Sequence, residues 1–383
     1  MNFDLTEEQK MIKELARKFA DEEVAPGARE NDLYARFPMD LPKKMAALGL
    51  LGGPIPEKYG GAGLDYICHA IITEEIGRAC SSIRTFTSAQ VSLVEISILK
   101  WGTEEQRLKY LPPLCKADII GCFGLTEPNA GSDAGSLSTT AVFQKDAWVL
   151  NGTKTWISNG GIADIALVIA RTGKEKHEGL TAFLVSKDAA GFSTKNIENK
   201  LGLRSSNTAE LIFDNCKIPR DAILGGLGDG FKIAMSALDN GRFSVAAGCV
   251  GIGQACIDAC IKYAKERIQF GKPIGNFQLV QDMIAKMVVD TEAARMLVYK
   301  AAHVKNKGQK STLETSIAKY FASEMAMRAA TDAVQIHGGY GYSNELPVER
   351  YFRDAKCATI YEGTSQIQKL IIGREVLGLK AFE

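Results

Sequence analysis

The residues that could do chemistry in this chain point to a carboxylate rather than to a histidine. The four histidines of the 383 residues lie far apart in sequence. Nucleophilic catalysis by serine or cysteine usually needs a nearby histidine, and the chain has no P-loop, HExxH or GxSxG motif and no GxGxxG after a strand. A base in this chain is therefore expected to be a carboxylate. Near the C-terminus, Thr364 and Ser365 could simply cap a helix, which would leave Glu362 a solvated carboxylate.

A metal centre is not predicted. The nine cysteines are scattered and form no CxxC pair. Cys256 and Cys260 share a helix face, but no nearby histidine or third cysteine completes a zinc set. Small, buried, reduced thiols fit this usage. An odd cysteine count behind an N-terminus without a signal peptide favours a cytoplasmic location.

Composition narrows the class of protein further. Hydrophobic residues make up 46% and charged residues 24% of the chain, which is enough for a large core. The 46 basic and 45 acidic residues leave a net charge of +1, so no global field attracts nucleic acid or an anionic membrane. No apolar run approaches the ~18 residues of a membrane span. We expect neither a nucleic-acid partner nor a membrane span.

The elements that must position a site fall into three blocks. Residues 1–119 have helical spacing, starting from a capping box of Thr6 and Gln9. Further helical stretches are predicted around 41–50, 66–80, 85–100 and 104–111. Residues 120–228 change to a period of two, with strands at 165–171, 180–186 and 209–213. In this block Asn151-Gly152 predicts a tight turn between strands 146–150 and 153–157.

Helical spacing returns over residues 229–383. Long helices are predicted near 231–265, 279–306 and 312–336, and a last one begins near Thr364. Helices of this length with few interruptions indicate a bundle. We predict an α+β fold with an N-terminal α-helical domain (1–119), a middle β-barrel-like domain (120–228) and a C-terminal four-helix bundle (229–383).

Several segments carry a resemblance to a known family. They are Leu125–Asp133 (LTEPNAGSD), Lys154–Asn159 (KTWISN), Arg267–Ile274 (RIQFGKPI) before Phe277-Gln278, Gln335–Gly341 (QIHGGYG) and Tyr361–Gln368 (YEGTSQIQ). Each is weak alone. Together, in this order and over the whole chain, they resemble the acyl-CoA dehydrogenase family. The helix, strand, helix order is consistent with that family's fold.

The resemblance implies an FAD cofactor held between subunits. Trp156 would flank the isoalloxazine ring, while Arg267, Phe270 and Gln278 would hold the adenine-diphosphate half of an FAD in the neighbouring subunit. Residues 335–339 would complete that grip, which implies an oligomer, expected to be a homotetramer. The full set of cofactor residues implied is Phe123, Leu125, Thr126, Gly131, Ser132, Trp156, Ile157, Ser158, Arg267, Gln269, Phe270, Gln278, Gln335, Gly338, Gly339, Thr364 and Gln366.

The resemblance also implies the reaction. Glu362 matches the family's catalytic base, which removes the α proton of an acyl-CoA thioester while a hydride leaves the β carbon for flavin N5. Burial would raise the pKa of this carboxylate, whereas the helix start after it would favour the anion. Electron-transferring flavoprotein would accept the electrons. The substrate-binding residues implied are Arg84, Ser132, Asp239, Arg242, Tyr361 and Gly363.

The segment Ser81–Gln90 bears on the acyl group. It resembles the matching stretch of glutaryl-CoA dehydrogenases, which place an arginine at the position of Arg84 to pair with the substrate's distal carboxylate. A buried arginine without a carboxylate partner would cost several kcal/mol. Arg84 therefore predicts a carboxylate-bearing acyl-CoA, either glutaryl-CoA or a substituted succinyl-CoA. Two positions depart from that pattern, since a glutamate of the glutaryl enzymes is Gly77 here and a serine is Thr85.

Other substrates and functions stay open on sequence grounds. If Arg84 points outward, or pairs with Glu74 or Glu75, a short-chain or cyclic neutral acyl-CoA is expected instead. An oxidase of the same fold would return electrons to oxygen and make peroxide. A flavin-free helical protein that binds an acyl-CoA or a protein partner is the alternative outside enzymes, and a colourless purified protein would identify it.

Overall fold

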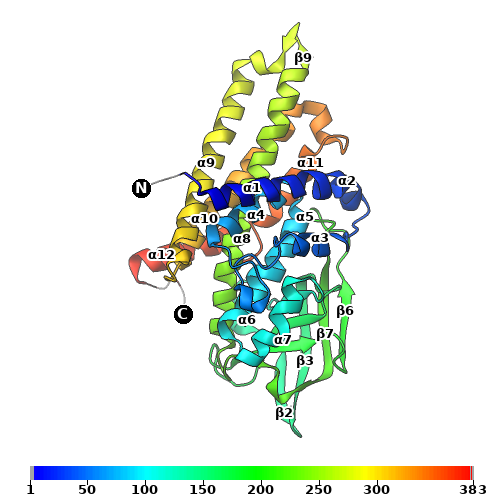
Figure 1. The fold of residues 1–383 in the computed structure, drawn as a ribbon, viewed down its shortest axis with the longest axis vertical. Coiled ribbons are helices and arrows are strands. Elements are labelled where there is room, and N and C mark those ends of the chain that lie inside the picture. Colours follow the sequence, from blue (N-terminus) through cyan, green and yellow to red (C-terminus); the bar gives the residue numbers. More distant parts are fainter. Residues whose placement is uncertain (1–3, 380, 382–383) are drawn as a thin grey trace.

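The structure is a computed structural model that describes residues 4–379 and 381. Its elements follow the predicted order of helices, sheet and helices (Figure 1). The N-terminal block contains helices α1 (Glu7–Phe19), α2 (Ala25–Leu33), α3 (Leu41–Ala47), α4 (Tyr66–Ala79), α5 (Ser81–Thr87), α6 (Ile96–Trp101) and α7 (Glu104–Cys115). Two π-helical stretches join them, η1 (Ala20–Val24) and η3 (Ser88–Glu95). The predicted helix over 85–100 is thus helical throughout, but its middle is a π-helix.

The first helix begins as the sequence predicts. Thr6 accepts a hydrogen bond from the backbone N–H of Gln9 at 3.2 Å, and the Gln9 side chain accepts one from the Thr6 N–H at 3.0 Å. The acidic Glu7 and Glu8 lie in the first turn, and the basic Arg17 and Lys18 lie in the last turn. Each charge is therefore next to the end of the helix dipole that has the opposite sign.

The middle of the chain forms a mixed eight-stranded sheet. Its order is β6-β7-β3-β2-β4-β5-β8, and β1 pairs in parallel with β4. The strands are β1 (Gly121–Gly124), β2 (Thr140–Gln144), β3 (Ala147–Ser158), β4 (Ile165–Arg171), β5 (Leu180–Ser186), β6 (Phe192–Asn196), β7 (Thr208–Pro219) and β8 (Ile223–Leu224). The sheet is the part of the chain that the sequence predicts as barrel-like.

The predicted turn at Asn151-Gly152 is wrong. Strand β3 runs straight through these residues, and its pairing with β7 shifts register there, which makes a bulge. Gly152 has φ +146° and lies against Thr139, so the glycine serves the bulge. The hairpin between β2 and β3 turns instead at Lys145 and Asp146, both with positive φ.

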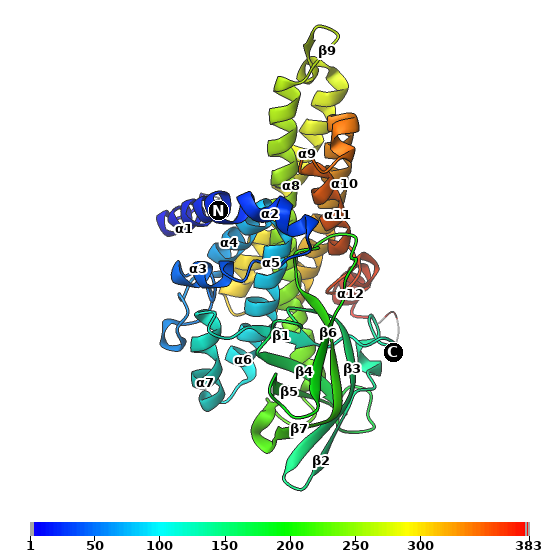
Figure 2. The same ribbon diagram turned by 90° about the vertical axis from the view of Figure 1, so that its right-hand side faces the viewer.

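The C-terminal block holds the long helices. They are α8 (Gly230–Glu266), α9 (Gln278–Asn306) and α10 (Thr312–His337), followed by α11 (Val348–Ala358) and α12 (Ser365–Leu377). Helix α11 is not among the elements expected from the sequence. Helices α8 and α9 project beyond the rest of the molecule and end in the small hairpin of β9 (Ile268–Gln269) and β10 (Lys272–Pro273), at the opposite end of the long axis from β2 (Figure 1, Figure 2). We call this end of the molecule the tip.

Helix α8 is the central element. It packs against α4, α9 and α10, and most of its buried apolar side chains belong to the largest core cluster. By length and composition α8 is the one helix in the described part of the chain that could cross a membrane, but most of it is buried inside the structure. Glycines on α8 allow close contacts, because the backbone of Gly248 lies against Gly77 of α4.

Candidate active site

The candidate base stands on an unusual backbone turn between α11 and α12. Glu362 has φ +54° and Gly363 has φ +94°, both in the left-handed region. Thr364 caps α12 by accepting a hydrogen bond from the N–H of Ile367 at 3.3 Å. A non-glycine residue at positive φ is uncommon and is often found at functional sites. The cap predicted from sequence is therefore present, and the strained residue in front of it is the predicted base.

The Glu362 carboxylate points into the protein. Its Oε2 is shielded from solvent and has no hydrogen-bond partner among the described residues. It lies over Gly241 of α8, where a β carbon would come within 1.8 Å of Oε2 and 2.8 Å of Leu93. The alternative of a solvated carboxylate is wrong, since α8 makes room for this side chain by lacking one of its own.

Burial has the largest effect on the pKa of Glu362. It raises the pKa of Glu362 to about 7, although the positive charges of Arg84, Lys319 and Arg242 act to lower it. Desolvation disfavours the charged form of a carboxylate, and nearby cations favour it. Burial therefore outweighs the three cations.

Arg84 is buried beside the base, with only 1% of its surface exposed. Its Nη2 donates a hydrogen bond to the hydroxyl of Tyr361, while Nε and Nη1 find no partner within the described ranges. The side chain crosses α8 at Gly248, where a β carbon would come within 2.5 Å of Nε. Buried polar groups normally have hydrogen-bond partners, so the two unpaired nitrogens are the feature of Arg84 that a ligand acceptor would explain.

The sequence also allows two other positions for Arg84, an outward orientation and an ion pair with Glu74 or Glu75, and both are wrong. It does not point outward, and the acids suggested as its partners are engaged elsewhere. Glu74 pairs with Arg295 at 2.9 Å, and Glu75 pairs with Arg17 at 3.1 Å and with Arg78 at 3.0 Å.

The other predicted substrate residues gather at the same place, apart from Ser132. Arg242 donates from Nε to the backbone carbonyl of Glu362 at 3.3 Å, and its Nη1 pairs with Asp239 at 2.7 Å. Asp239 also accepts from the hydroxyl of Thr312. Tyr361 and Gly363 flank the base. Ser132 lies on the exposed loop after β1.

A second group of predicted residues lies on the sheet. Trp156 is 61% exposed and has φ +61°, at a second register shift of β3, so it is not the core aromatic that a strand tryptophan usually is. The neighbouring Thr155 N–H donates to the carbonyl of Thr126 at 2.9 Å, which joins the two predicted segments. Gly131 is exposed, whereas the predicted residues with buried side chains are Phe123, Leu125 and Ile157.

A third group lies at the tip. Arg267, Gln269, Gly338 and Gly339 line one hollow there, and the Arg267 guanidinium stands 5.5 Å from the ring centroid of Tyr340. Phe270, on the turn of the hairpin, is 93% exposed. The remaining predicted members of this group, Gln278 and Gln335, are also on the surface.

These two surfaces fit a flat, phosphate-bearing cofactor such as FAD. An exposed tryptophan and an exposed phenylalanine offer ring faces. At Gly131, Gly338 and Gly339 an added β carbon would meet nothing within 4 Å, so the backbone is open to a close ligand. Arg267 supplies a charge for a phosphate. Thr364 and Gln366 stand at the start of α12, beside the base.

Sequence reasoning missed several residues that build the site. Gly241 and Gly248 lie seven residues apart on α8, which places them on one face of a helix, and this spacing could have marked them. Lys319 of α10 donates from Nζ to the carbonyl of Gly363 at 2.7 Å. Gln368 of α12 donates to the carbonyls of Glu362 and Gly363. No local pattern in the sequence points to these last two contacts.

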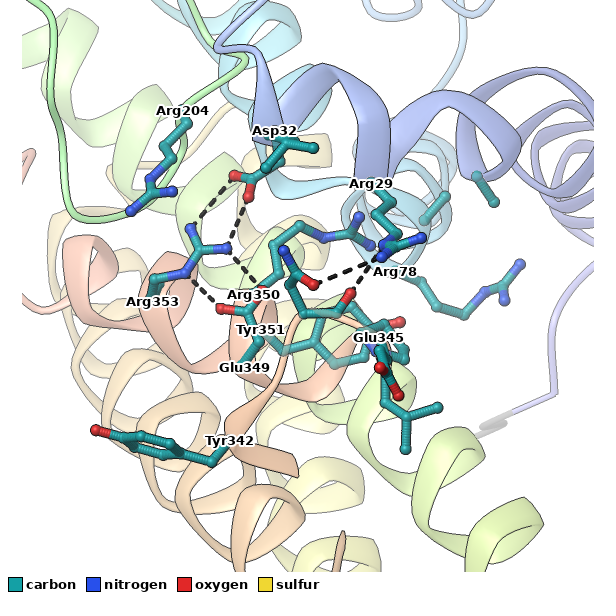
Figure 3. A pocket seen from close by; sticks show the side chains of 16 residues that line it. Arg29, Asp32, Arg78, Arg204, Tyr342, Glu345, Glu349, Arg350, Tyr351 and Arg353 are labelled. Atoms are coloured by element: carbon teal, nitrogen blue, oxygen red, sulfur yellow. Dashed lines mark hydrogen bonds and ion pairs between the residues drawn. The ribbon is translucent and has the colours of Figure 1, made fainter. Parts of the chain in front are cut away.

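A cavity of about 600 Å³ beside α11 is not this site (Figure 3). It is lined by arginines and carboxylates that largely satisfy one another. Arg353 pairs with Asp32 at 2.7 Å and with Glu349 at 2.6 Å, and Arg29 donates to the carbonyl of Asn344 at 2.8 Å. Within the described ranges it contains none of the predicted site residues, and its ion pairs join α2 to α11.

Comparison with known proteins places the chain in one family. The family descriptions "Acyl-CoA dehydrogenase, N-terminal domain", "middle domain" and "C-terminal domain" match residues 6–118, 122–216 and 228–377. An acyl-CoA dehydrogenase of Bacillus subtilis is 47% identical over 98% of this chain and 99% of its own length.

Solved structures agree with this result. The butyryl-CoA dehydrogenase of Megasphaera elsdenii superposes with a TM-score of 0.96 at 43% identity, over 98% of this chain and 100% of the other. A glutaryl-CoA dehydrogenase in complex with glutaryl-CoA gives 0.96 at 44% identity, over 99% and 98%. A glutaryl-CoA dehydrogenase of Mycobacterium smegmatis in complex with FADH2 gives 0.95 at 34% identity, over 99% and 97%. The chain belongs to the acyl-CoA dehydrogenase family and is an FAD-dependent oxidoreductase.

Proposed function

We propose that this protein oxidises an acyl-CoA to its 2,3-enoyl-CoA, with Glu362 as the base that removes the α proton. The observation that carries the proposal is the Glu362 carboxylate, held over Gly241 with Oε2 shielded from solvent and unpartnered in the described part of the chain. A general base works best when its pKa lies near the working pH, and the pKa of Glu362 is raised to about 7. FAD, when bound, would supply the acceptor for the hydride that leaves the β carbon.

Arg84 favours a substrate whose acyl group ends in a free carboxylate, either glutaryl-CoA or a substituted succinyl-CoA. Its buried Nη1, which has no partner in the described part of the chain, would donate to that carboxylate, and a charge-assisted hydrogen bond is stronger than a neutral one. The base and the arginine rest on Gly241 and Gly248, which are separated by about 10 Å of helix at 1.5 Å per residue. A short acyl chain with a terminal carboxylate spans such a distance.

A neutral short-chain or cyclic acyl-CoA is the second candidate. It is favoured by the hydrogen bond from Arg84 to Tyr361, because that contact partly satisfies the guanidinium without a substrate. It is also favoured by Gly77, where glutaryl-CoA dehydrogenases carry a glutamate and where the backbone of Gly248 leaves no room for a side chain. The butyryl-CoA dehydrogenase relative is as similar to this chain as the glutaryl-CoA relative.

We propose two protein partners, namely electron-transferring flavoprotein and further copies of this chain. Electron-transferring flavoprotein would reoxidise the flavin, and an oxidase would instead form peroxide in air. The exposed aromatic residues of the sheet and of the tip support an assembly in which neighbouring subunits share each FAD, expected to be a homotetramer.

The test of the base is anaerobic bleaching of the flavin by acyl-CoA. Glu362→Gln is expected to keep its yellow flavin and lose bleaching with every substrate. Glu375→Gln, the same change farther along α12, is the matched control and should bleach normally. Bleaching at the wild-type rate in Glu362→Gln would place the base elsewhere.

The test of the substrate class uses the same readout with glutaryl-, methylsuccinyl-, butyryl- and cyclohexanoyl-CoA. Arg84→Ala is expected to lose about a hundredfold in efficiency with the dicarboxylic substrates and far less with the neutral ones, because truncating one partner of a buried charge pair costs 2–5 kcal/mol. Tyr361→Phe removes only the hydroxyl beside Arg84 and is the milder comparison. Equal losses on all substrates would exclude the carboxylate-bearing class.

A further inference from the structure

The backbone turn that carries Glu362 is held by three side chains from three helices. The carbonyl of Glu362 accepts from Arg242 of α8 at 3.3 Å and from Gln368 of α12 at 3.2 Å. The carbonyl of Gly363 accepts from Gln368 at 2.9 Å and from Lys319 of α10 at 2.7 Å. Each carbonyl therefore has two donors, and a backbone in the left-handed region is fixed by contacts from outside its own segment.

Among these three side chains, Lys319 is the one whose charge is buried without an ion pair to any described residue. It is fully buried, and the ionisable groups around it are Cys249, Glu362, Arg242 and Cys357. Burial lowers the pKa of its ammonium to about 8, so the charged form still prevails at neutral pH. Taking a charge out of water is unfavourable unless an opposite charge is near. The carboxylate among these neighbours is Glu362.

The charges that face the base come from several elements. They are Arg84 of α5, Arg242 of α8 and Lys319 of α10, and Ser88 of η3 adds a hydroxyl. Arg242 is already paired with Asp239, and Arg84 donates to Tyr361. Lys319 has no ion pair of its own in the described part of the chain, so its charge remains available to the base.

We propose that Lys319 is a positioning residue for the reaction: its ammonium holds the Gly363 carbonyl so that the Glu362 carboxylate stays over Gly241, and it stabilises that carboxylate when it ionises. The proposal rests on Glu362 being the base. It assigns Lys319 no contact with substrate or flavin. A lysine is needed for this because a neutral donor would hold the turn without stabilising the anion.

The experiment separates the charge from the hydrogen bond. The rate of anaerobic bleaching by a saturating acyl-CoA is measured from pH 5.5 to 9 in wild type, Lys319→Met, Lys319→Arg and Gln368→Leu. Lys319→Met is expected to move the acid limb of the profile to higher pH by about one unit, because the Lys319 charge acts to lower the pKa of the Glu362 carboxyl and the substitution removes it. Its rate should fall at pH 7 and recover in part at pH 9.

The other variants give the matched comparisons. Lys319→Arg keeps the charge, so its acid limb should remain near that of wild type. Gln368→Leu removes a neutral donor from the same carbonyls and should slow bleaching without moving the limb. Lys200→Met removes a different, half-buried lysine, whose Nζ donates to the Ser206 carbonyl and whose pKa is also lowered to about 8. It controls for general effects of losing such a group and should leave the limb in place.

A second readout does not need turnover of the flavin. Exchange of the substrate's α proton with solvent deuterium reports on the base alone, and its pH dependence should shift in Lys319→Met in the same way. An unshifted limb in Lys319→Met, or an equal shift in Lys200→Met, would overturn the proposal. Should Lys319→Met fail to fold, a shifted limb in Lys319→Arg would overturn it and an unshifted one would support it. Normal bleaching by Glu362→Gln would overturn both this proposal and the proposed function.

Discussion

At Gly241 the lack of a side chain is what gives the base its place, so this glycine should be as sensitive as the base itself. Gly241→Ala would put a methyl group within 1.8 Å of Glu362 Oε2. A misplacement of about 1 Å at a reacting group can cost on the order of a hundredfold in rate. We expect such a loss of bleaching rate with neutral and dicarboxylic acyl-CoAs alike, measured on protein with a normal circular dichroism spectrum.

Gly248→Ala is the matched control for this change on the same face of α8. Its methyl group would meet Arg84 Nε at 2.5 Å rather than the base. The loss should therefore be confined to dicarboxylic substrates, with neutral ones close to wild type. A general loss in Gly248→Ala, or full activity in Gly241→Ala, would contradict this reading of the two glycines.

A second carboxylate, Glu95 of η3, should make stability depend on pH. It is fully buried, Oε1 has no partner among the described residues, and burial raises its pKa from 4.5 to about 8. Between these values the folded state holds a proton that the unfolded state releases, so the free energy of unfolding falls as pH rises. At about 1.36 kcal/mol per pKa unit, the loss by pH 7 is on the order of 3 kcal/mol.

Glu95→Gln removes this titration. Its advantage over wild type in the free energy of unfolding should therefore grow from pH 5 to pH 8 in urea titrations. Glu105→Gln, on the exposed surface of α7, is the control for the substitution. A constant difference between Glu95→Gln and wild type across this range would show that Glu95 ionises in the folded protein as it does in water.

At the scale of the element, the turn between β2 and β3 offers a stabilising change. Lys145 and Asp146 have φ of +47° and +68°, which is unfavourable for residues with a side chain. The pair Lys145→Asn with Asp146→Gly would supply the sequence that a two-residue type I′ turn prefers. We expect the free energy of unfolding to rise by about 1 kcal/mol. Gly152→Ala should lower it, because a β carbon there would meet the backbone of Thr139 at 2.8 Å.

The same strand shows why the sequence predicted some elements and not others. The spacing of apolar residues predicts the bounds of the long helices well. The helix predicted over 279–306, for example, is α9 (Gln278–Asn306) in the structure. Asn151-Gly152 has the composition of a turn, but the register of β3 against β7 is set by residues distant in sequence. Glu362 was found through its resemblance to a family motif. Lys319 and Gln368 could not be, because their role depends on which helices meet at one turn.

At the scale of the whole molecule, the predicted FAD residues other than Thr364 and Gln366 form two groups on one chain. Trp156 belongs to the sheet, while Phe270 and Arg267 belong to the tip at the far end of the long axis (Figure 1). Both aromatic side chains are largely exposed, as expected of surfaces that another chain covers. In a two-fold pair whose chains meet sheet to tip, each FAD site would combine the sheet of one chain with the tip of the other.

This arrangement predicts that two inactive variants restore activity when mixed. Arg267→Ala weakens FAD binding at the tip but leaves the base intact. Glu362→Gln removes the base but leaves the tip intact. In a mixed pair, the Arg267→Ala chain has its own Glu362 and an intact tip from its neighbour, so that site should work. Random pairing puts about half of the molecules in mixed pairs with one working site each, so about a quarter of wild-type activity is expected.

The measurement is acyl-CoA bleaching after the two variants are unfolded together and refolded with FAD, against each variant refolded alone. Mixing Glu362→Gln with Gly241→Ala is the control, because both changes damage the base end and no pairing can repair either site. If the cofactor were held within one chain, the Arg267→Ala mixture would stay as inactive as its parents. Recovery in that mixture but not in the control would locate the sheet and the tip of each FAD site on different subunits.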